Sequence, residues 1–188
     1  MGIEENPGFR VMALSSAGCI WANSVDALPK EVPDGVYLAA EIVPRDAEDV
    51  LQSLQADLGP RLLVPEVWRK VLPDAGILIS SSLSGGTLQN RLEDAERASP
   101  GRCWLRLERL RMRFPLPCPT GVGTALTPAE LGRLLQANPT FYSPEFCCRY
   151  CYDLPGGIVL YDTDETWECK RKLAQSAGFS GAVIPSEG

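Results

Sequence analysis

Short apolar runs alternate along this chain with segments that have the periodicity of amphipathic helices. Alternation of this kind favours a parallel sheet covered by helices, because parallel strands need a long crossover connection. Several runs are apolar on both faces, as strands buried between helices require. The eight candidate strands are residues 9–14, 35–43, 61–64, 76–81, 102–107, 112–116, 157–161 and 181–184. The sequence therefore predicts an α/β fold.

Four segments have the pattern of helices, with apolar side chains on one stripe. Thr127, Pro128 and Glu130 form a capping-box pattern with proline in the first turn. Ser84 or Thr87 is expected to cap the helix that follows it. The helices are expected at 46–58, at 87–98, from Thr127 onward, and from Asp162 or Thr163 to Gly178.

A chain of 188 residues is long enough for one well-buried core. We expect a single domain, residues 1–188, with flexible ends at 1–8 and 186–188. Eight strands with helices between them suggest a (β/α) barrel of the TIM type, which usually needs about 200–250 residues or more. The barrel is therefore expected to be compact or incomplete. Because nothing between 102–107 and 112–116 can cross over, these two runs are alternatively one bent strand.

The chain has no histidine and a formal net charge of −6. The acidic balance argues against nucleic acid as a partner. The lack of histidine excludes Ser-His-Asp and Cys-His catalysis within one chain, so acid–base chemistry would use carboxylates, Tyr, Lys or Cys. No apolar run approaches the roughly 18 residues of a membrane span, and no signal-peptide pattern is visible. A cytoplasmic location is expected, and the oligomeric state stays open.

The seven cysteines include a cluster formed by Cys147, Cys148 and Cys151. Cys148 and Cys151 have the spacing of half a zinc ribbon, but no second pair follows. We expect no metal site and interpret the cysteines as buried or unreactive thiols. The role of the cluster stays open.

The segment 34–41 reads Asp-Gly-Val-Tyr-Leu-Ala-Ala-Glu and ends a strand-like run in a lone carboxylate. Residues alternate faces along a strand, so Tyr37, Ala39 and Glu41 project to one side. In a parallel barrel that side is the interior, and the end of the strand opens onto the catalytic mouth. The octet therefore places Glu41 where a functional carboxylate is expected.

The octet resembles the DxxDxDxE signature of family 18 glycoside hydrolases, with Tyr37 and Ala39 in place of the two middle acids. Weaker matches to the spore-germination type of this family follow in chain order. They are Ser16-Ala-Gly18-Cys19 for an SxGG motif, 114–117 for a G-x-P-L-Y-G-like strand, 142–152 for the insert before the penultimate strand, and 159–184 for the closing strand–helix–strand.

The resemblance implies an N-acetylated or peptidoglycan-like glycan as ligand, no cofactor, and Glu41 as general acid. Ser16 is the implied ligand contact. Tyr37 is an aromatic candidate for stacking on sugar faces, or else a core residue. In the family, an Asp two residues before the Glu orients the substrate's acetamido group and keeps the acid protonated. Ala39 can do neither, so the resemblance implies little or no hydrolysis.

Glu108 and Asp162 are candidates for a second carboxylate. A separation of about 5–10 Å from Glu41 would suit a two-carboxylate glycosidase. Alternatively, Glu108 is held in a salt bridge with a neighbouring arginine. Tyr142 and Tyr161 are candidates for stacking on sugar faces, or else core residues.

Three functions stay open at this stage. The leading hypothesis is a degenerate glycoside-hydrolase-like barrel that binds a glycan or a protein partner. The first alternative is an active glycosidase that uses Glu41 with a recruited second carboxylate. The second alternative is a structural or regulatory scaffold, which predicts a mouth plugged by side chains such as Tyr37 and no open pocket.

Overall fold

The computed structural model describes residues 10–13, 19–22, 35–38, 48–82, 85–153 and 156–184. Its larger sheet has seven strands, and every neighbouring pair is parallel. In spatial order they are β1 (Arg10–Ala13), β12 (Gly181–Ile184), β6 (Cys103–Arg106), β5 (Gly76–Ser80), β4 (Leu62–Pro65), β3 (Gly35–Leu38) and β2 (Cys19–Ala22).

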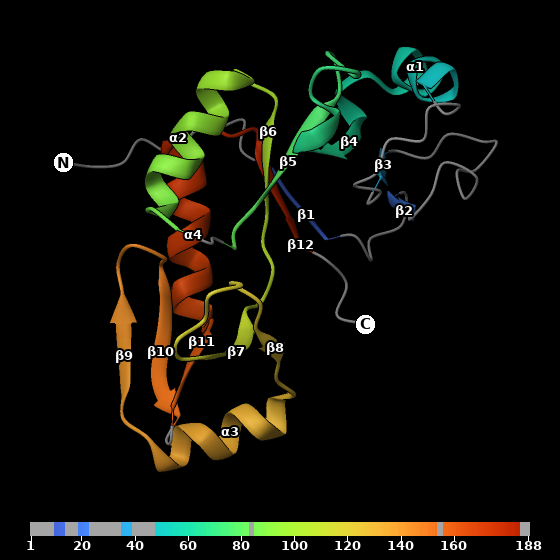
Figure 1. The fold of residues 1–188 in the computed structure, drawn as a ribbon. Coiled ribbons are helices and arrows are strands. Elements are labelled where there is room, and N and C mark those ends of the chain that lie inside the picture. The colour runs from blue at the N-terminus through green and yellow to red at the C-terminus, as the bar shows by residue number, and fades with distance from the viewer. Residues whose placement is uncertain are drawn as a thin grey trace.

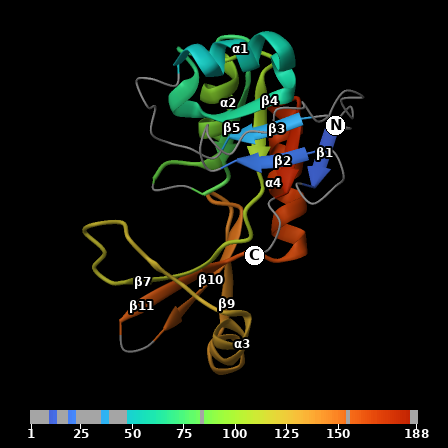
Figure 2. The ribbon, with the colours of Figure 1, turned by 90° about the vertical axis from the view of Figure 1, so that its right-hand side faces the viewer.

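This order is that of an open barrel. Strands β2 to β6 follow one another in sequence, and β12 joins β6 to β1. A closed (β/α)8 barrel has eight strands, whereas the described residues contribute seven to this sheet. The prediction of an α/β fold with a compact or incomplete barrel is therefore confirmed. Figures 1 and 2 show the twisted sheet from two sides.

The main core lies between this sheet and three helices: α1 (Glu48–Leu58), α2 (Leu88–Ala98) and α4 (Asp164–Ser176). Two short 3-10 helices, Gly59–Arg61 and Glu66–Trp68, flank β4. The core contains large apolar side chains that are at most 2% exposed. Examples are Leu51, Leu62, Trp68, Ile77, Ile79, Leu88, Leu92 and Leu105.

The helix boundaries agree with the signals in the sequence. The Thr87 hydroxyl accepts a hydrogen bond from the Asn90 amide at 3.2 Å, so Thr87 caps α2. Thr163 caps α4, which ends just before Gly178. Gly178 has a φ of +94°, a left-handed conformation that glycine adopts without a Cβ clash. In the part of the chain that the structure describes, no helix is long and apolar enough to cross a bilayer.

Side chains on the concave face of the sheet form a second cluster: Tyr37, Leu63, Leu78, Trp104 and Val183. The Trp104 ring packs directly against β12. A Cβ added at Gly181 would lie 2.4 Å from the Trp104 ring and 2.2 Å from the Arg10 carbonyl oxygen. Glycine at 181 is therefore what allows β1, β12 and Trp104 to approach so closely.

A second, antiparallel sheet is inserted between β6 and α4 (Figure 1). In spatial order it contains β8 (Thr124–Ala125), β7 (Arg111–Pro115), β11 (Gly157–Tyr161), β10 (Cys148–Asp153) and β9 (Thr140–Ser143). Helix α3 (Pro128–Ala137) packs its leucines against the face that carries Cys151, Val159 and Tyr161.

This insertion corrects part of the sequence analysis. Residues 112–116 and 157–161 are strands, as predicted, but their assignment to the parallel sheet is wrong, because β7 and β11 pair antiparallel with each other. The single bent strand over 102–116 is also wrong: the chain leaves β6 and enters a different sheet. The organisation as one domain stays a prediction, and the ends 1–8 and 186–188 lie outside the described residues.

Candidate functional site

The carboxyl ends of β3, β4, β5 and β6 surround a cavity of about 340 Å³. In parallel barrels this edge of the sheet holds the active site, because the loops that follow the strands meet there. We name this cavity the mouth pocket. It is lined by Tyr37, Pro65, Glu66, Val67, Leu78, Ser80, Arg91 and Arg106.

Tyr37 forms the floor of the mouth pocket. Its side chain is 2% exposed and packs in the concave cluster with Leu63 and Leu78. The guanidinium carbon of Arg106 lies 5.9 Å from the centroid of the Tyr37 ring, within the range of a cation–π contact. Tyr37 is thus at the mouth, as the sequence predicted, and presents a ring there rather than an acid.

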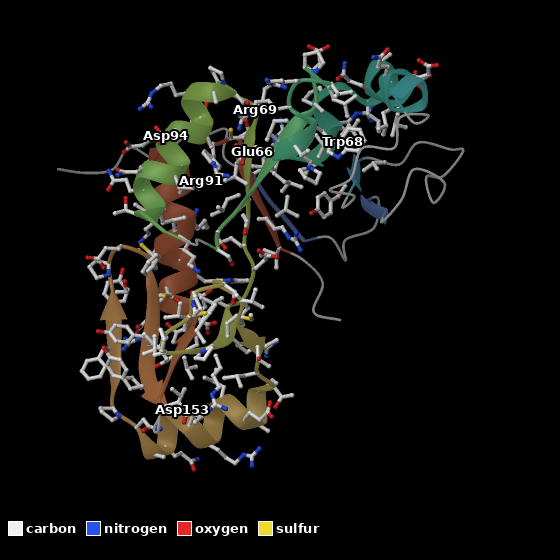
Figure 3. The ribbon with its side chains drawn as sticks, viewed as in Figure 1. Glu66, Trp68, Arg69, Arg91, Asp94 and Asp153 are labelled. Carbon is white, nitrogen blue, oxygen red and sulfur yellow. The ribbon has the colours of Figure 1, made fainter. Side chains whose placement is uncertain are left out.

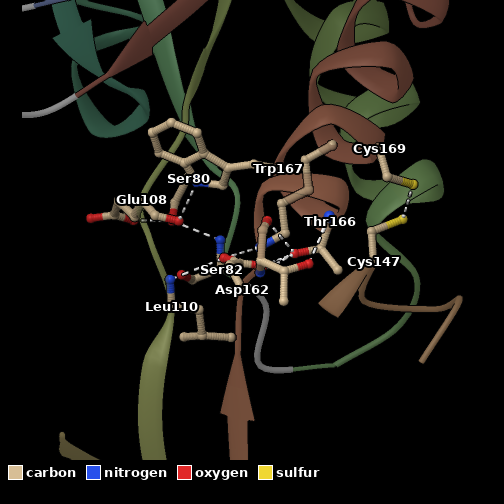
Figure 4. A network of polar contacts seen from close by, with 11 residues as sticks. Ser80, Ser82, Glu108, Leu110, Cys147, Asp162, Thr166, Trp167 and Cys169 are labelled. Carbon is tan, nitrogen blue, oxygen red and sulfur yellow. Dashed lines mark hydrogen bonds and ion pairs between the residues drawn. The ribbon is translucent and has the colours of Figure 1, made fainter. Parts of the chain in front are cut away.

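Glu108 lies just beyond the end of β6, at the edge of the mouth pocket. Its Oε2 accepts a hydrogen bond from the Ser80 hydroxyl at 2.9 Å, and its Oε1 is 2.9 Å from Nη2 of Arg106. The Trp167 indole donates to the Glu108 main-chain oxygen at 3.3 Å (Figure 4). These contacts hold a carboxylate that is still 31% exposed. The ion pair with a neighbouring arginine, which was the alternative interpretation of Glu108, is therefore present.

Asp162 follows β11 and is enclosed completely. Its Oδ2 lies 2.7 Å from Nζ of Lys170 and accepts from the Leu110 amide at 3.0 Å. Its Oδ1 accepts from the Thr166 hydroxyl at 2.9 Å. The exposed fractions of the Asp162 and Lys170 side chains are 0% and 1%. This arrangement joins α4 to the start of the insertion. The Asp162 carboxylate is therefore not exposed to the mouth pocket.

A larger cavity of about 970 Å³ runs along the face of the second sheet opposite α3. We name it the sheet groove. Met112 and Leu160 are paired across β7 and β11, as are Phe114 and Ile158, and all four line it. Glu108 lines the other end. Because the two partners of Glu108, Ser80 and Arg106, line the mouth pocket, the two cavities meet at this carboxylate.

Glu66 is a mouth residue that the sequence analysis did not identify. It follows β4 directly and is ion-paired with both Arg69 and Arg91 (Figure 3). Burial raises the pKa of this carboxyl, but the hydrogen bonds and charges of Arg91 and Arg69 outweigh that effect and lower the pKa below its usual value. The mouth pocket therefore contains an ionised carboxylate held between two guanidinium groups. The signal in the sequence was its position after an apolar strand.

Of the other predicted ligand contacts, Tyr142 and Tyr161 are described, and neither lines the mouth pocket. Tyr142 is 46% exposed on β9 and lines neither cavity. Tyr161 is 4% exposed in the core of the second sheet, beneath α3. Ser16 and Glu41 lie outside the described residues, so their proposed roles stay predictions.

The cysteine cluster is arranged as buried thiols. Cys148 and Cys151 are both 0% exposed. Because they are three positions apart on β10, they point to opposite faces of the sheet and do not share a ligand site. Among the residues that the structure describes, no group of three or more metal-ligating side chains is present.

Comparison with known proteins identifies the fold. No protein-family model and no curated protein matches the sequence. The spore cortex-lytic enzyme SleL of Bacillus cereus matches with a TM-score of 0.57 and 13% identity. The match covers 81% of this chain and 44% of the SleL chain. A class V chitinase from Nicotiana tobaccum matches 80% of this chain over 63% of its own, with a TM-score of 0.56 and 11% identity.

A chitinase of glycoside hydrolase family 18 from Cycas revoluta, solved in complex with (GlcNAc)3, also matches. It covers 80% of this chain over 62% of its own, with a TM-score of 0.52 and 12% identity. The chain thus spans less than two thirds of the length of each of these structures. Its fold is a compact or incomplete barrel like that of the family 18 glycoside hydrolases.

Proposed function

We propose that this chain binds an N-acetylated glycan, or a peptidoglycan-like one, at the mouth pocket and hydrolyses it little or not at all. The similar structures support the choice of ligand class, since they include a chitinase bound to (GlcNAc)3 and a spore cortex-lytic enzyme. The likeness to them is one of fold. The residues of this chain must therefore carry the rest of the proposal.

The observation that carries the proposal is the contact between Tyr37 and Arg106 at the floor of the mouth pocket. In the resemblance to the family 18 signature, position 37 belongs to one of the acids that support the general acid. Here an aromatic ring, covered by a guanidinium, occupies it. Loss of one such electrostatic partner typically lowers the rate by about 10²–10³-fold. Binding survives this replacement more readily than catalysis does.

The two cavities offer the chemistry that a sugar chain requires. The mouth pocket presents the Ser80 hydroxyl, the Glu66 carboxylate and guanidinium groups, which can bond to hydroxyl and acetamido groups. The sheet groove adds an apolar wall that includes Phe114 and Met112, suited to the C–H faces of sugar rings. Cavities of about 300–1,000 Å³ are typical of ligand sites, and both fall in this range. The mouth is therefore open, which favours a ligand site over the scaffold alternative.

An active glycosidase is the second candidate, and one observation favours it. Glu108 is partly exposed where the two cavities meet, whereas Asp162 is enclosed. Glu108 is therefore the better of these two carboxylates to act with Glu41. This mechanism requires the two carboxyl groups to lie about 5–10 Å apart.

A calorimetric titration with chito-oligosaccharides and with a soluble peptidoglycan fragment, followed by product analysis of the same samples, tests the proposal. We expect binding without cleavage. Ser80→Ala and Glu108→Gln should weaken binding by about 10-fold, the value of one hydrogen bond to a charged group. Asp94→Asn is the matched control, because Asp94 forms an exposed pair with Arg97 on α2.

The outcomes separate the three functions. Cleavage that is abolished by both Glu41→Gln and Glu108→Gln would overturn the proposal in favour of an active glycosidase. Neither binding nor cleavage by a folded protein would leave the scaffold alternative.

A further inference from the structure

Two cysteine sulfurs are in contact in a part of the molecule that the proposed function does not use. The Sγ atoms of Cys147 and Cys169 are 3.2 Å apart (Figure 4). Cys147 lies in the turn between β9 and β10, and Cys169 lies on α4. Both are free thiols. In the part of the chain that the structure describes, no other two cysteine sulfurs are in contact.

The surroundings of the pair give each thiol a different accessibility. Cys147 is 3% exposed, whereas Cys169 is half-buried. Burial raises the pKa of the Cys147 thiol to about 11. The Tyr142 hydroxyl lies 3.6 Å from the Cys169 sulfur and is itself on the surface. A reagent from solvent therefore reaches the Cys169 sulfur before the more deeply buried Cys147 sulfur.

We propose that Cys147 and Cys169 form a reversible disulfide that ties the β9–β10 turn of the second sheet to α4. The sulfurs need to approach by only about 1 Å to reach a disulfide bond length of about 2.05 Å. Small rotations of the two side chains supply such a shift. The bond would close a loop between residues 22 positions apart.

The oxidant is a low-molecular-weight disulfide such as oxidised glutathione. The Cys169 thiolate attacks one sulfur of it, which forms a mixed disulfide and expels one glutathione thiolate. The Cys147 thiolate then attacks the Cys169 sulfur and expels the second. The two protein thiols lose two electrons and two protons, and the glutathione disulfide is reduced to two thiols.

The bond would stabilise the chain, because it restricts the unfolded state. For a loop of this length, the chain-entropy relation and the size of the protein give a rise in melting temperature of roughly 7–13 °C. The disulfide would tie the inserted sheet more firmly to the barrel, because α4 contacts β10 of the inserted sheet as well as β6 and β12.

The experiment equilibrates the folded chain in glutathione buffers of increasing oxidising strength and then blocks free thiols with iodoacetamide. Non-reducing peptide mapping should show residues 147 and 169 linked, and fragmentation between residues 147 and 148 excludes the neighbouring Cys148. The melting temperature should rise with oxidation and return on addition of dithiothreitol.

Cys147→Ala and Cys169→Ala should each abolish the shift. Cys118→Ala is the matched control, because Cys118 is partly exposed and makes its contact with the Val122 carbonyl oxygen. Alkylation of both residues in fully oxidising buffer, or a linkage to any other cysteine, would overturn the proposal. The peptide map of the unmodified sequence decides this even where a variant does not fold.

Discussion

The ammonium group of Lys170 lies 2.7 Å from the Asp162 carboxylate, and neither side chain reaches solvent. Each charge therefore depends on the other. Removal of one partner from a buried pair costs about 3–5 kcal/mol, because the remaining charge is left without compensation. We expect Lys170→Met to lower the free energy of unfolding by this amount in urea titrations.

Lys172→Met is the matched control for this prediction. Lys172 is on the same helix but is 57% exposed, and its Nζ lies 3.8 Å from a carboxylate oxygen of Glu168. Exposed pairs of this kind contribute about 0–1 kcal/mol. Equal effects of the two substitutions would show that the Asp162–Lys170 contact does not support the fold.

Gly181 is expected to be intolerant of any side chain. Gly181→Ala would place a Cβ against the Arg10 carbonyl and the Trp104 ring, so we expect a loss of about 1–3 kcal/mol or more. Gly132→Ala is the opposite control, because it lies in α3 and no described atom beyond the neighbouring helix backbone lies within 4 Å of the added Cβ. That change should stabilise the protein by about 0.5–1 kcal/mol. Thermal unfolding of the two variants measures the expected loss of stability at position 181 and the expected gain at position 132.

Glu66 makes stability depend on acidity. Its pKa is lower in the folded chain than the ordinary value of 4.5. The ionised form is therefore favoured by folding, and its contribution is present above pH 4.5 and is lost as the pH falls through the folded pKa. We expect the stability difference between the unmodified protein and Glu66→Gln to be present at pH 7 and to shrink below pH 4.5. A difference that stays constant from pH 7 to pH 3 would contradict this assignment.

The proposed loss of hydrolysis can be tested by partial restoration of the signature. Ala39→Asp supplies the acid that the resemblance places two residues before Glu41. If the missing partner limits catalysis, hydrolysis of a chito-oligosaccharide should rise by about 10²–10³-fold. Ala39→Asn is the control, because it matches the size of Asp without its charge. A folded Ala39→Asp variant that binds the sugar and shows no gain would contradict this explanation.

The parallel part of the fold could be predicted because its signals are local. Both-face apolar runs such as 76–81 and caps such as Thr87 and Thr163 depend on a few adjacent residues, and the structure places them as expected. The second sheet could not be assigned in this way. Residues 157–161 are apolar enough for either sheet, and their antiparallel partners β7 and β10 decide which sheet they join.

The site was predictable in part for the same reason. Tyr37 was identified because it lies on the predicted inner face of its strand, and Glu108 because it ends a strand run, where strand ends meet at the mouth. Asp162 also directly follows a strand run, but its burial depends on Lys170, eight residues later on α4. The contact of Cys147 with Cys169 likewise joins a turn to a helix, and no spacing rule relates them.

The place of β12 in the sheet has a consequence for how the chain folds. Arg10 of β1 pairs with Gly181 of β12, so β1 pairs with a strand that is synthesised much later than itself. Contacts between such distant parts of a chain form slowly, because a very long loop must close first. During synthesis β2 to β6 can assemble in turn, while β1 has no partner on this side until β12 has been synthesised. Deletion of 181–184 would therefore remove the neighbour that β1 and β6 share, so β12 is the strand that ties β1 to the rest of the sheet.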